Sequence, residues 1–378
     1  MKILINAIGI LDSGGVTVLE KLIKELIAEE KDNKFTFLIT KNPQIDLIVE
    51  KYIQYSVLEF RNVSFKGYLG RLIYENITLR RVIAKYNVNL IYNFSGTSQF
   101  FIQIPQLIKI HNLLFYSQKL DKSYQEKSHI FLWLKQVFLK RQLLRLMISQ
   151  SRHIEIQSKH VSEYLSDFVD TSKKSFYIKS DIDLCDDLFK APREYDFSKK
   201  IKILYVVGPH FKYLHKNVAD FTHAMVSLRK AGLNFEINIT LTSEQLNLST
   251  VWDESLNCIT NFHGYVSDPK KMDKLYSDNT ILISTSIIET LGLHVIEAIQ
   301  QGVVFIVPDE IYAREVYGNV EFSYELFDSN SLCKVLMRVI SNVDSLNAKI
   351  LEQQNYLKKN ESEKIDSILE IFREVLNV

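Results

Sequence analysis

Two glutamates with a glycine between them could bind a ligand rich in hydroxyl groups. Glu289 and Glu297 are eight positions apart, and Gly292 lies between them. The apolar run at 280–285 predicts a buried strand, and the run that ends at Gly302 predicts a helix. The turn between them is where α/β folds bind ligands, and the exposed N–H groups of the helix favour an anion such as phosphate. Glutamates near a helix N-terminus can also serve only to offset the helix dipole. The surrounding elements must therefore decide between a ligand-binding role and a structural one.

The second half of the chain predicts a parallel sheet flanked by helices, because strand and helix patterns alternate. A strand at about 200–207 is followed by Gly208, and a helix is expected over about 217–231. Further strands are expected at 235–240, 261–263, 280–284 and 303–307, and a further helix at 270–277.

The first half shows the same alternation. Strand 2–7 leads into a loop that contains Gly14 and Gly15, and apolar residues from Val16 to Ile27 then recur at helical spacing. The two glycines would let this loop approach a ligand closely, or they serve only to start the helix. Further strands are expected at 35–39, 90–93, 106–110, 146–148 and 175–178.

The polar stretch at about 188–199, with Pro192, reads as a linker between two α/β halves. We expect one domain over 1–190 and a second over 191–358. The last segment, 359–378, has apolar residues at helical spacing and is expected to pack back on the first domain as a helix. Two such halves predict a cleft between them, which is a favoured place for a ligand.

Size and composition limit the function classes. The chain has 378 residues and a net charge of +1, which allows two full cores and does not favour a polyanion as partner. Three cysteines without metal or redox spacing (Cys185, Cys258 and Cys333) suit a reducing cytoplasm. No run approaches the length of apolar residues that crosses a membrane, so we expect a cytoplasmic protein.

The motifs together resemble those of retaining glycosyltransferases of family 4, which have the GT-B fold. The family pattern S-x-x-E-x-(F/Y)-G-L-x-x-x-E-A matches 286–298, with Leu291 in place of the aromatic residue. Residues 262–266 resemble the family's F-x-G-x-V strand end, and 302–308 its next strand without the usual proline. The resemblance implies an α/β protein with two Rossmann-like parallel-sheet domains that face a central cleft, with acceptor bound on the first and nucleotide sugar on the second.

The same resemblance implies roles in the second half. Glu289 is expected to bond hydroxyls of the donor sugar, and Glu297 the ribose of the nucleotide; carboxylates discriminate well for hydroxyl groups. The remaining residues expected to bind the donor are Thr290, Leu291, Gly292 and Leu293, through backbone N–H groups, and Gly208, Tyr265, Val266, Gly14 and Gly15.

A departing diphosphate needs positive charge. The family supplies an Arg just after the strand-end glycine and a Lys about five residues later. Here Pro209 holds the Arg position, Lys216 matches the Lys, and Lys212 or His210 is a candidate substitute for the Arg. The alternative interpretation is that these residues are solvated side chains of a loop and do not bind the diphosphate. A lysine would lack the bidentate geometry of arginine.

In the first half, His111 resembles a strand-end histidine that lies near the reacting side of the sugar. A structural histidine is the alternative. Asp181 and Asp183 match the D-x-D pattern of Mn²⁺-dependent glycosyltransferases, but they stand where the family ends its first domain. We therefore expect no metal site, and no cofactor besides the nucleotide-diphosphate sugar, which is the donor substrate.

Residues 119–159 contain nine Lys or Arg and three Asp or Glu, a net charge of +6, interleaved with apolar residues from Phe131 to Leu143. Such a helix could bind an anionic membrane surface and suit a lipid-linked acceptor. A core helix with a solvated basic face is equally compatible. No nucleic-acid-binding module is evident, so no nucleic-acid partner is expected.

These features predict a retaining, metal-independent hexosyl- or N-acetylhexosaminyltransferase. It would move a sugar from a nucleotide-diphosphate donor to a glycan or lipid-linked acceptor in bacterial surface polysaccharide or lipopolysaccharide synthesis, in the cytoplasm or on the inner face of the cytoplasmic membrane. A sugar-nucleotide epimerase or hydrolase of the same fold is the first alternative. Because Pro209 replaces the Arg, a non-catalytic sugar-nucleotide-binding subunit is the second.

Overall fold

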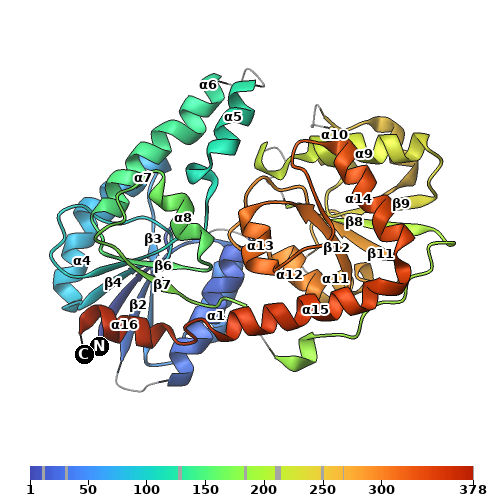
Figure 1. The fold of residues 1–378 in the computed structure, drawn as a ribbon. Coiled ribbons are helices and arrows are strands. Elements are labelled where there is room, and N and C mark those ends of the chain that lie inside the picture. Colours follow the sequence, from blue (N-terminus) through green and yellow to red (C-terminus); the bar gives the residue numbers. More distant parts are fainter. Residues whose placement is uncertain are drawn as a thin grey trace. The chain divides into compact units, whose positions relative to one another are not determined.

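The computed structural model describes residues 1–10, 13–29, 33–126, 130–182, 185–208, 214–247, 251–266 and 268–377 (Figure 1). The chain divides into two compact units. The first unit comprises Met1–Tyr116, Phe131–Ile182 and Ser362–Val378, and the second comprises Ser117–Ile130 and Asp183–Glu361.

The first unit contains a parallel sheet of seven strands in the order β3-β2-β1-β4-β5-β6-β7. The strand order reverses between β1 and β4, so this unit has a topological switch point at their carboxyl ends. The strands are β1 (Lys2–Asn6), β2 (Lys34–Thr40), β3 (Leu58–Val63), β4 (Leu90–Asn93), β5 (Gln106–Lys109), β6 (His153–Ile156) and β7 (Ser175–Ile178).

Helices of the first unit flank this sheet (Figure 1). Apolar residues of α1, spaced along one face, pack in the same buried cluster as Ile368, Leu369 and Phe372 of the last helix, α16. The helical segments are α1 (Ser13–Glu29), α2 (Pro43–Tyr52), α3 (Gly67–Ile73), the π-helix η1 (Tyr74–Thr78), α4 (Leu79–Tyr86), η2 (Leu114–Tyr116), α6 (Ile130–Trp133), the π-helix η3 (Leu134–Phe138), α7 (Leu139–Ser149), α8 (His160–Ser166) and α16 (Ile368–Leu376).

The second unit contains a parallel sheet of six strands in the order β10-β9-β8-β11-β12-β13. Its order reverses between β8 and β11, which places a second switch point at the carboxyl ends of these strands. The strands are β8 (Ile201–Tyr205), β9 (Phe235–Ile239), β10 (Thr260–Phe262), β11 (Thr280–Ile283), β12 (Val304–Pro308) and β13 (Ser323–Tyr324).

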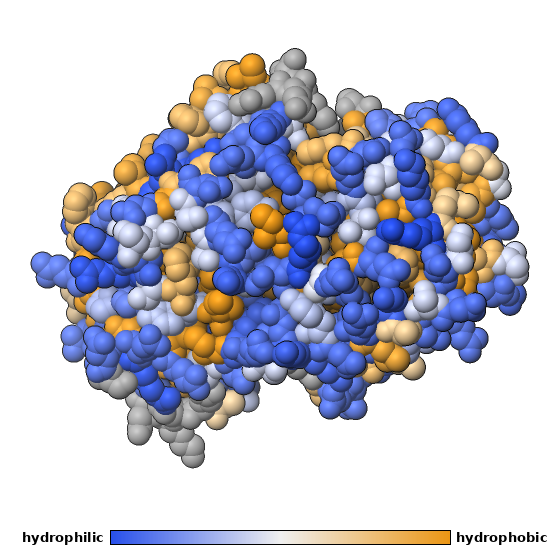
Figure 2. Space-filling view, viewed as in Figure 1, coloured by the Kyte–Doolittle hydropathy of each residue, from blue (hydrophilic) through white to orange (hydrophobic). Residues whose placement is uncertain are grey.

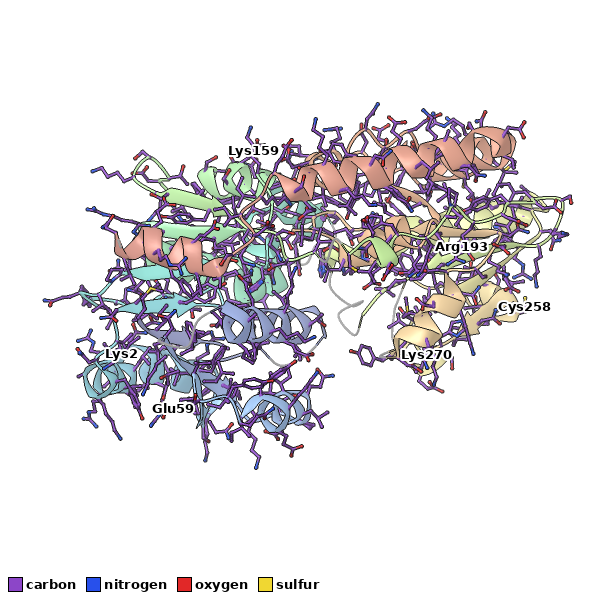
Figure 3. All side chains as sticks on the ribbon, turned by 90° about the horizontal axis from the view of Figure 1, so that it is seen from below. Lys2, Glu59, Lys159, Arg193, Cys258 and Lys270 are labelled. Carbon is purple, nitrogen blue, oxygen red and sulfur yellow. The ribbon has the colours of Figure 1, made fainter. Side chains whose placement is uncertain are left out.

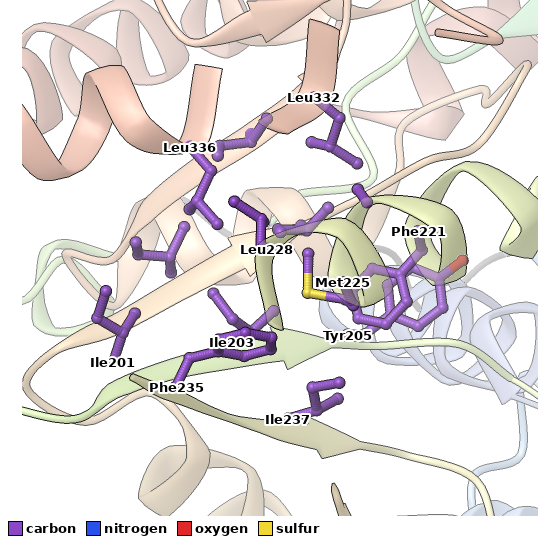
Figure 4. Packing of buried hydrophobic residues seen from close by; sticks show 14 of the residues in the cluster. Ile201, Ile203, Tyr205, Phe221, Met225, Leu228, Phe235, Ile237, Leu332 and Leu336 are labelled. Atoms are coloured by element: carbon purple, nitrogen blue, oxygen red, sulfur yellow. The ribbon is translucent and has the colours of Figure 1, made fainter. Parts of the chain in front are cut away.

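Side chains of α9, α14, β8 and β9 form the core on one face of this sheet (Figure 4). Met225 and Leu228 of α9 and Leu336 of α14 are buried there against the strands. The helical segments are α5 (Gln118–Glu126), η4 (Asp186–Leu188), η5 (Leu214–Lys216), α9 (Val218–Lys230), α10 (Ser243–Asn247), η6 (Glu254–Ile259), α11 (Pro269–Leu275), α12 (Leu293–Gln300), α13 (Ile311–Tyr317), α14 (Ser329–Ser341) and α15 (Val343–Ser362).

The structure confirms two Rossmann-like parallel-sheet units but corrects one predicted strand. Residues 146–148 do not form a strand; they lie in the last turn of α7, and the strand that follows is β6. A short apolar run is ambiguous, because Met147 and Ile148 are buried at a helix end as fully as they would be in a strand. Strand β3 was not predicted, since its middle residues are partly or fully exposed and the strand lies at the sheet edge.

The segment expected to be a linker is hydrogen-bonded to the second unit. The backbone N–H of Lys190 donates to the carbonyl of Gln300 over 2.7 Å, and that of Arg193, labelled in Figure 3, donates to Gly302 over 2.9 Å. Gly302 has a φ of +69°, and a Cβ there would overlap the carbonyl oxygen of Ala191. Residues 190–193 therefore pack closely against the end of α12.

The end of the chain also differs from the single helix expected over 359–378. Helix α15 runs on to Ser362, and α16 begins at Ile368 after a short break. Ile365, within that break, pairs with Lys179 beside β7, and Ser367 caps α16 by accepting the N–H of Leu369. Among the described helices, none is both long enough and apolar enough to cross a membrane.

Candidate functional site

A lysine and a glutamate form an ion pair at the switch point of the second unit. Nζ of Lys216, the last residue of η5, lies 2.6 Å from Oε1 of Glu289. Both side chains are 18% exposed, so the pair is largely screened from water yet still accessible. Lys216 follows β8 and Glu289 follows β11, and these two strands are neighbours in the sheet. The fold thus brings together two residues that the sequence singled out separately.

The charge of Lys216 decides the protonation state of Glu289. Burial alone would raise the pKa of the Glu289 carboxyl, but the positive charge of Lys216, with smaller contributions from His294 and His215, lowers that pKa to about 2. Glu289 is therefore an anion at neutral pH. It can accept hydrogen bonds from hydroxyl groups through both oxygens.

The backbone of Lys216 is fixed by the strands on which it rests. Its carbonyl oxygen accepts hydrogen bonds from the Tyr205 hydroxyl at 3.2 Å and from Thr285 Oγ1 at 2.8 Å. The next residue, Asn217, has a left-handed φ of 45°, and its side-chain amide donates to Asp220 over 2.6 Å. These contacts turn the chain into α9 and hold the Lys216 side chain over the carboxyl ends of β8 and β11.

The turn between Glu289 and α12 requires a glycine. Gly292 has a φ of +61°, and a Cβ there would overlap the hydroxyl of Tyr317. That hydroxyl donates to the carbonyl of Leu291 over 2.8 Å, so it holds the turn from the side of α13. Leu291 is buried, and Leu293 begins α12. The first N–H groups of α12 therefore lie close to the same turn as Glu289.

His294 belongs to the site, although the sequence did not single it out. Its Nε2 lies 2.9 Å from Ser284 Oγ. Burial and then the charge of Lys216 lower the pKa of His294 to about 4, so the ring is neutral at neutral pH. The motif leaves this position unspecified, and only its place in the first turn of α12 could have drawn attention to it.

The second glutamate of the motif lies further along α12 and is exposed. Glu297 Oε2 accepts a hydrogen bond from the hydroxyl of the buried Tyr276 at 3.2 Å. Tyr265, which is 58% exposed, and Val266 follow β10. They lie at the same carboxyl edge of the sheet as Glu289, three strands away from β11.

The loop after β8 is described only in part. Gly208 is exposed and is the last described residue of the strand-end segment. The candidate cations Lys212 and His210, together with Pro209, lie outside the described residues.

The first unit holds the predicted histidine at the end of β5. His111 Nε2 lies 2.6 Å from the carbonyl oxygen of Phe94, and the two rings meet edge to face at 4.8 Å. Burial and the nearby charge of Lys109 lower the pKa of His111 to about 4. Because a carbonyl only accepts, Nε2 carries the proton and Nδ1 the lone pair.

Asp181, half of the D-x-D pattern, is part of a buried ion-pair cluster. Lys109 Nζ lies 2.7 Å from Asp181 and 2.5 Å from Glu155, with all three side chains nearly inaccessible. Gln157 also donates to Asp181 over 2.6 Å. Asp183 lies outside the described residues. Within the described parts of the chain, no group of three His, Cys, Asp or Glu residues could hold a metal ion.

Gly14 and Gly15 lie inside the first turn of α1, not in the loop before it. The side chain of Ile10 packs against Gly15, where a Cβ would meet Cγ2 of Ile10 at 3.3 Å. Gly9, with a φ of +91°, is a glycine of this loop that does adopt a left-handed conformation.

Comparison with known proteins identifies the fold. A sucrose-phosphate synthase from Thermosynechococcus elongatus is similar with a TM-score of 0.70 at 14% identity, covering 100% of this chain and 99% of that one. Alr3699/HepE from Anabaena, solved with UDP and glucose, gives 0.63 at 11% identity, covering 100% and 99%. The lipopolysaccharide outer core galactosyltransferase WaaB gives 0.61 at 14%, covering 95% and 98%. No curated protein sequence matches.

Residues 190–367 match the family model described as glycosyl transferases group 1. This range contains Lys216, Glu289 and Glu297, and it coincides with most of the second unit. The second unit thus contains a segment similar to the glycosyl transferases group 1, and the two units of the chain have the GT-B fold.

Proposed function

We propose that the protein transfers a sugar, with retention of anomeric configuration, from a nucleotide-diphosphate donor to a glycan or lipid-linked acceptor. The observation that carries this proposal is the Lys216–Glu289 pair at the carboxyl ends of β8 and β11. Each partner suits a different part of one donor. The ammonium group suits the diphosphate, and the carboxylate suits the sugar hydroxyls.

The pair also suggests how the site is kept ready before a donor binds. Lys216 and Glu289 satisfy each other's charge over 2.6 Å. A bound donor would replace this contact on both sides, with phosphate oxygens at Lys216 and hydroxyls at Glu289. The N–H groups at the start of α12 would add donors to the diphosphate, because Gly292 lets the ligand approach the backbone. Glu297 would hydrogen-bond the ribose of the nucleotide.

In the transfer, the bond between the anomeric carbon and the diphosphate oxygen breaks while an acceptor hydroxyl oxygen bonds to the same carbon from the same face. The hydroxyl proton passes to the departing phosphate oxygen, so no protein nucleophile is required. Lys216 stabilises the charge that develops on the diphosphate, and on this proposal no metal ion is needed. Neutral His111 would hydrogen-bond near the reacting side of the sugar.

A nucleotide-sugar panel tests the donor assignment. UDP-, GDP-, ADP- and TDP-sugars would be added separately, and the thermal unfolding midpoint measured for each, because a ligand that binds only the folded state raises it. We expect the nucleotide sugars of one base to raise the unfolding midpoint more than the others. If none shifts the midpoint, no nucleotide sugar binds and the proposal is wrong.

Product analysis with the preferred donor separates the rival enzyme classes. A transferase gives a glycosylated acceptor, a hydrolase free sugar, and an epimerase an altered nucleotide sugar. Tight donor binding with no turnover against any acceptor would favour a non-catalytic binding subunit.

We further propose that the acceptor is used in bacterial surface polysaccharide or lipopolysaccharide synthesis, at an anionic membrane surface. Segment α6–η3–α7 exposes large apolar side chains: Ile130 at 60%, Phe131 at 80%, Leu134 at 41%, Leu139 at 58% and Leu146 at 59%. Figure 2 shows hydrophobic residues along the edge where these helices lie in Figure 1. Lys135, Lys140 and Arg145 are exposed on the same helices.

Co-sedimentation with vesicles tests the membrane proposal. We expect stronger binding to vesicles with anionic lipid than to neutral ones, and weaker binding for Phe131→Ser and for Lys135→Gln/Lys140→Gln. Equal binding to both kinds of vesicle would contradict it. A basic face that is merely solvated would give that result.

A further inference from the structure

The switch point of the first unit holds an arginine whose terminal donors are only partly used by the described residues. Strands β1 and β4 are neighbours, and the loops at their carboxyl ends meet there. Arg71, on α3, reaches this point from the side. Its Nη2 donates to Ser95 Oγ at 3.0 Å and to Thr97 Oγ1 at 3.2 Å, both in the loop after β4.

A buried carboxylate forms an ion pair with this arginine. Nε of Arg71 lies 3.2 Å from Oε1 of Glu75, which is fully buried in the π-helix η1. The same oxygen accepts from Asn6 Nδ2 at 3.0 Å and from Thr97 Oγ1 at 3.1 Å. Glu75 is thereby fixed to both loops of the switch point, and it fixes the guanidinium in turn. π-Helices of this kind are frequent at functional sites.

The remaining terminal nitrogen faces the loop after β1. A guanidinium has one hydrogen on Nε and a pair on each terminal nitrogen. Nε and Nη2 are used as described above, whereas Nη1 makes no hydrogen bond within the described part of the chain. It lies against Gly9, where a Cβ would overlap it, so a side chain at that position would displace it. The Arg71 side chain keeps 15% of its surface exposed.

A fixed guanidinium whose Nη1 has no partner in the described ranges is suited to an anion at a switch point. Charge-assisted hydrogen bonds from arginine to phosphate or carboxylate are among the stronger polar contacts in proteins. An arginine that served only to pair with Glu75 would not need donors at the rim of the sheet. The hydroxyls of Ser95, Thr97 and Thr40, whose Oγ1 accepts from Gly9 N at 3.4 Å, make the same rim polar.

The histidine predicted to lie near the reacting side of the sugar contacts the same short loop. His111 Nε2 bonds the carbonyl of Phe94, and Arg71 bonds the next residue, Ser95, and then Thr97. An acceptor lying along this loop would have one end at the neutral histidine and the other at the guanidinium.

We propose that Arg71 binds an anionic group, phosphate or carboxylate, carried by the acceptor, while the reacting hydroxyl lies toward His111. This inference rests on the proposed transferase function and specifies its acceptor: a phosphorylated or acidic saccharide in place of a neutral one. Glu75 is a positioning residue in this arrangement, because it acts through Arg71.

Equilibrium binding of small probes tests the inference without knowledge of the natural acceptor. Glucose 6-phosphate, glucuronate and neutral glucose would be titrated into the full chain, with the nucleoside diphosphate of the preferred donor as a separate ligand. We expect both anionic sugars, or one of them, to bind more tightly than glucose by about tenfold to a hundredfold, the usual worth of a charge-assisted hydrogen bond. The preferred anion distinguishes a phosphorylated from an acidic acceptor.

Variants of Arg71 and Glu75 separate ligand binding from a structural role. Arg71→Gln alone would leave Glu75 buried without its cation, which is costly. The pair Arg71→Gln/Glu75→Gln removes both charges together and preserves the fold. We expect it to bind anionic sugar no better than glucose. Glu75→Gln alone keeps the arginine but loses the carboxylate that positions it, so its affinity for the anion should lie between that of the unchanged protein and that of the double variant. The affinity of Arg71→Lys for the anionic sugar should lie between those of the unchanged protein and the double variant.

The outcomes are distinct from those of the proposed function. If no nucleotide sugar of the panel binds the unchanged protein, the transferase proposal itself is contradicted. If the nucleoside diphosphate of the preferred donor binds, but glucose and the anionic sugars bind equally well or the anion affinity is retained in Arg71→Gln/Glu75→Gln, only the role of Arg71 is overturned. A drop in affinity for that nucleoside diphosphate in the double variant would also overturn it, because the arginine would then serve the donor.

Discussion

Lys216 and Glu289 lie 73 positions apart in sequence, and their side chains meet over 2.6 Å where β8 and β11 end. The carbonyl of Lys216 is bonded by Tyr205 at the end of β8 and by Thr285 just after β11, so the distance depends on the pairing of these two strands. The contact joins a cation suited to a diphosphate and an anion suited to a sugar in one small site. Changes at either residue, or at the turn beside them, should therefore have separable effects.

Glu289→Gln should remove most of the transferase activity. The amide has the size of the carboxylate but can accept through one oxygen only, so the sugar hydroxyls lose a partner that a hydroxyl-binding site needs. We expect kcat/KM to fall about 100-fold or more, measured with the preferred nucleotide sugar. Glu254→Gln, at an exposed position in the same unit, is the matched control and should be unchanged. Undiminished transfer in Glu289→Gln would remove the sugar-binding assignment.

Lys216→Met should weaken the binding of the nucleotide diphosphate. The variant keeps the length of the side chain and loses the charge that faces the phosphates, so we expect affinity for UDP or its analogue to fall about tenfold or more. Titration calorimetry measures this directly. Lys230→Met, at the far end of α9, changes a lysine away from the site and serves as control. Unchanged affinity in Lys216→Met would place the diphosphate elsewhere.

The same variant should alter the response to acid. With Lys216 present, the pKa of Glu289 is about 2, so the carboxylate persists throughout the usual assay range. A depressed folded-state pKa contributes stability above the unfolded value near 4.5, and this is lost as pH falls through the folded value. Without Lys216, burial dominates and Glu289 takes up a proton at higher pH. The folded variant then binds this proton more tightly than the unfolded chain does. The contribution of Glu289 to the free energy of unfolding of Lys216→Met should therefore rise as pH falls through the raised pKa, whereas in the unchanged protein it falls below about pH 4.5, as measured by urea denaturation.

Gly292→Ala should disrupt the turn that begins α12. The substitution imposes a left-handed backbone on alanine, and its Cβ overlaps the Tyr317 hydroxyl. We expect a loss of about 2–4 kcal/mol in the free energy of unfolding, together with lost donor binding. Gly232 has a similar φ of +81°, and a Cβ placed there would have nothing within 4 Å, so Gly232→Ala reports the backbone cost alone.

Removing the Tyr317 hydroxyl isolates the steric part of that loss. Gly292→Ala/Tyr317→Phe should be more stable than the sum of the two single changes predicts, because the overlapping oxygen is gone. Strict additivity in this cycle would mean that the clash is relieved in another way.

Two neutral histidines should make the protein sensitive to mild acid. The folded-state pKa values of His111 and His294 are both about 4, below the ordinary value of 6.5, so each ring takes up a proton more readily in the unfolded chain. The free energy of unfolding should fall as pH drops from about 6.5 to 4, by up to about 1.4 kcal/mol per pH unit for each group.

Single substitutions distinguish the two groups. His111→Asn and His294→Asn should each reduce this slope, whereas His223→Asn, which removes an exposed imidazole on α9, is the control. A slope that is the same in all three variants would show that other groups are responsible.

Local patterns predicted the second-half motif well. The buried strand before Ser286, the turn at Gly292 and the helix after it follow from composition and periodicity within a dozen residues. The pairing of Lys216 with Glu289 was within reach as well, because an alternating pattern predicts a parallel sheet and both residues follow strands.

The residues that support the site were not predictable in this way. Tyr317 belongs to another helix, and its contact with Leu291 arises from packing that no local period records. Arg71 gave no signal either, because an arginine on a short helix usually has a solvated side chain, and only the buried position of Glu75 makes it notable. The strand expected at 146–148 was wrong for a different reason. The apolar run is present and buried, but such a run is equally compatible with the end of a helix.

The docking of residues 190–193 on α12 bears on how the second unit can be produced by itself. Gln354 Nε2 bridges the carbonyls of Lys190 and Ile299, and Tyr195 accepts the N–H of Val304. A fragment that began at β8, where the regular structure resumes, would lack these partners. The C-terminal end of α12, the helix that carries Glu297, would then lose their hydrogen bonds. An independently folding piece should begin before Phe189, so that the segment before the first strand is retained as part of the domain.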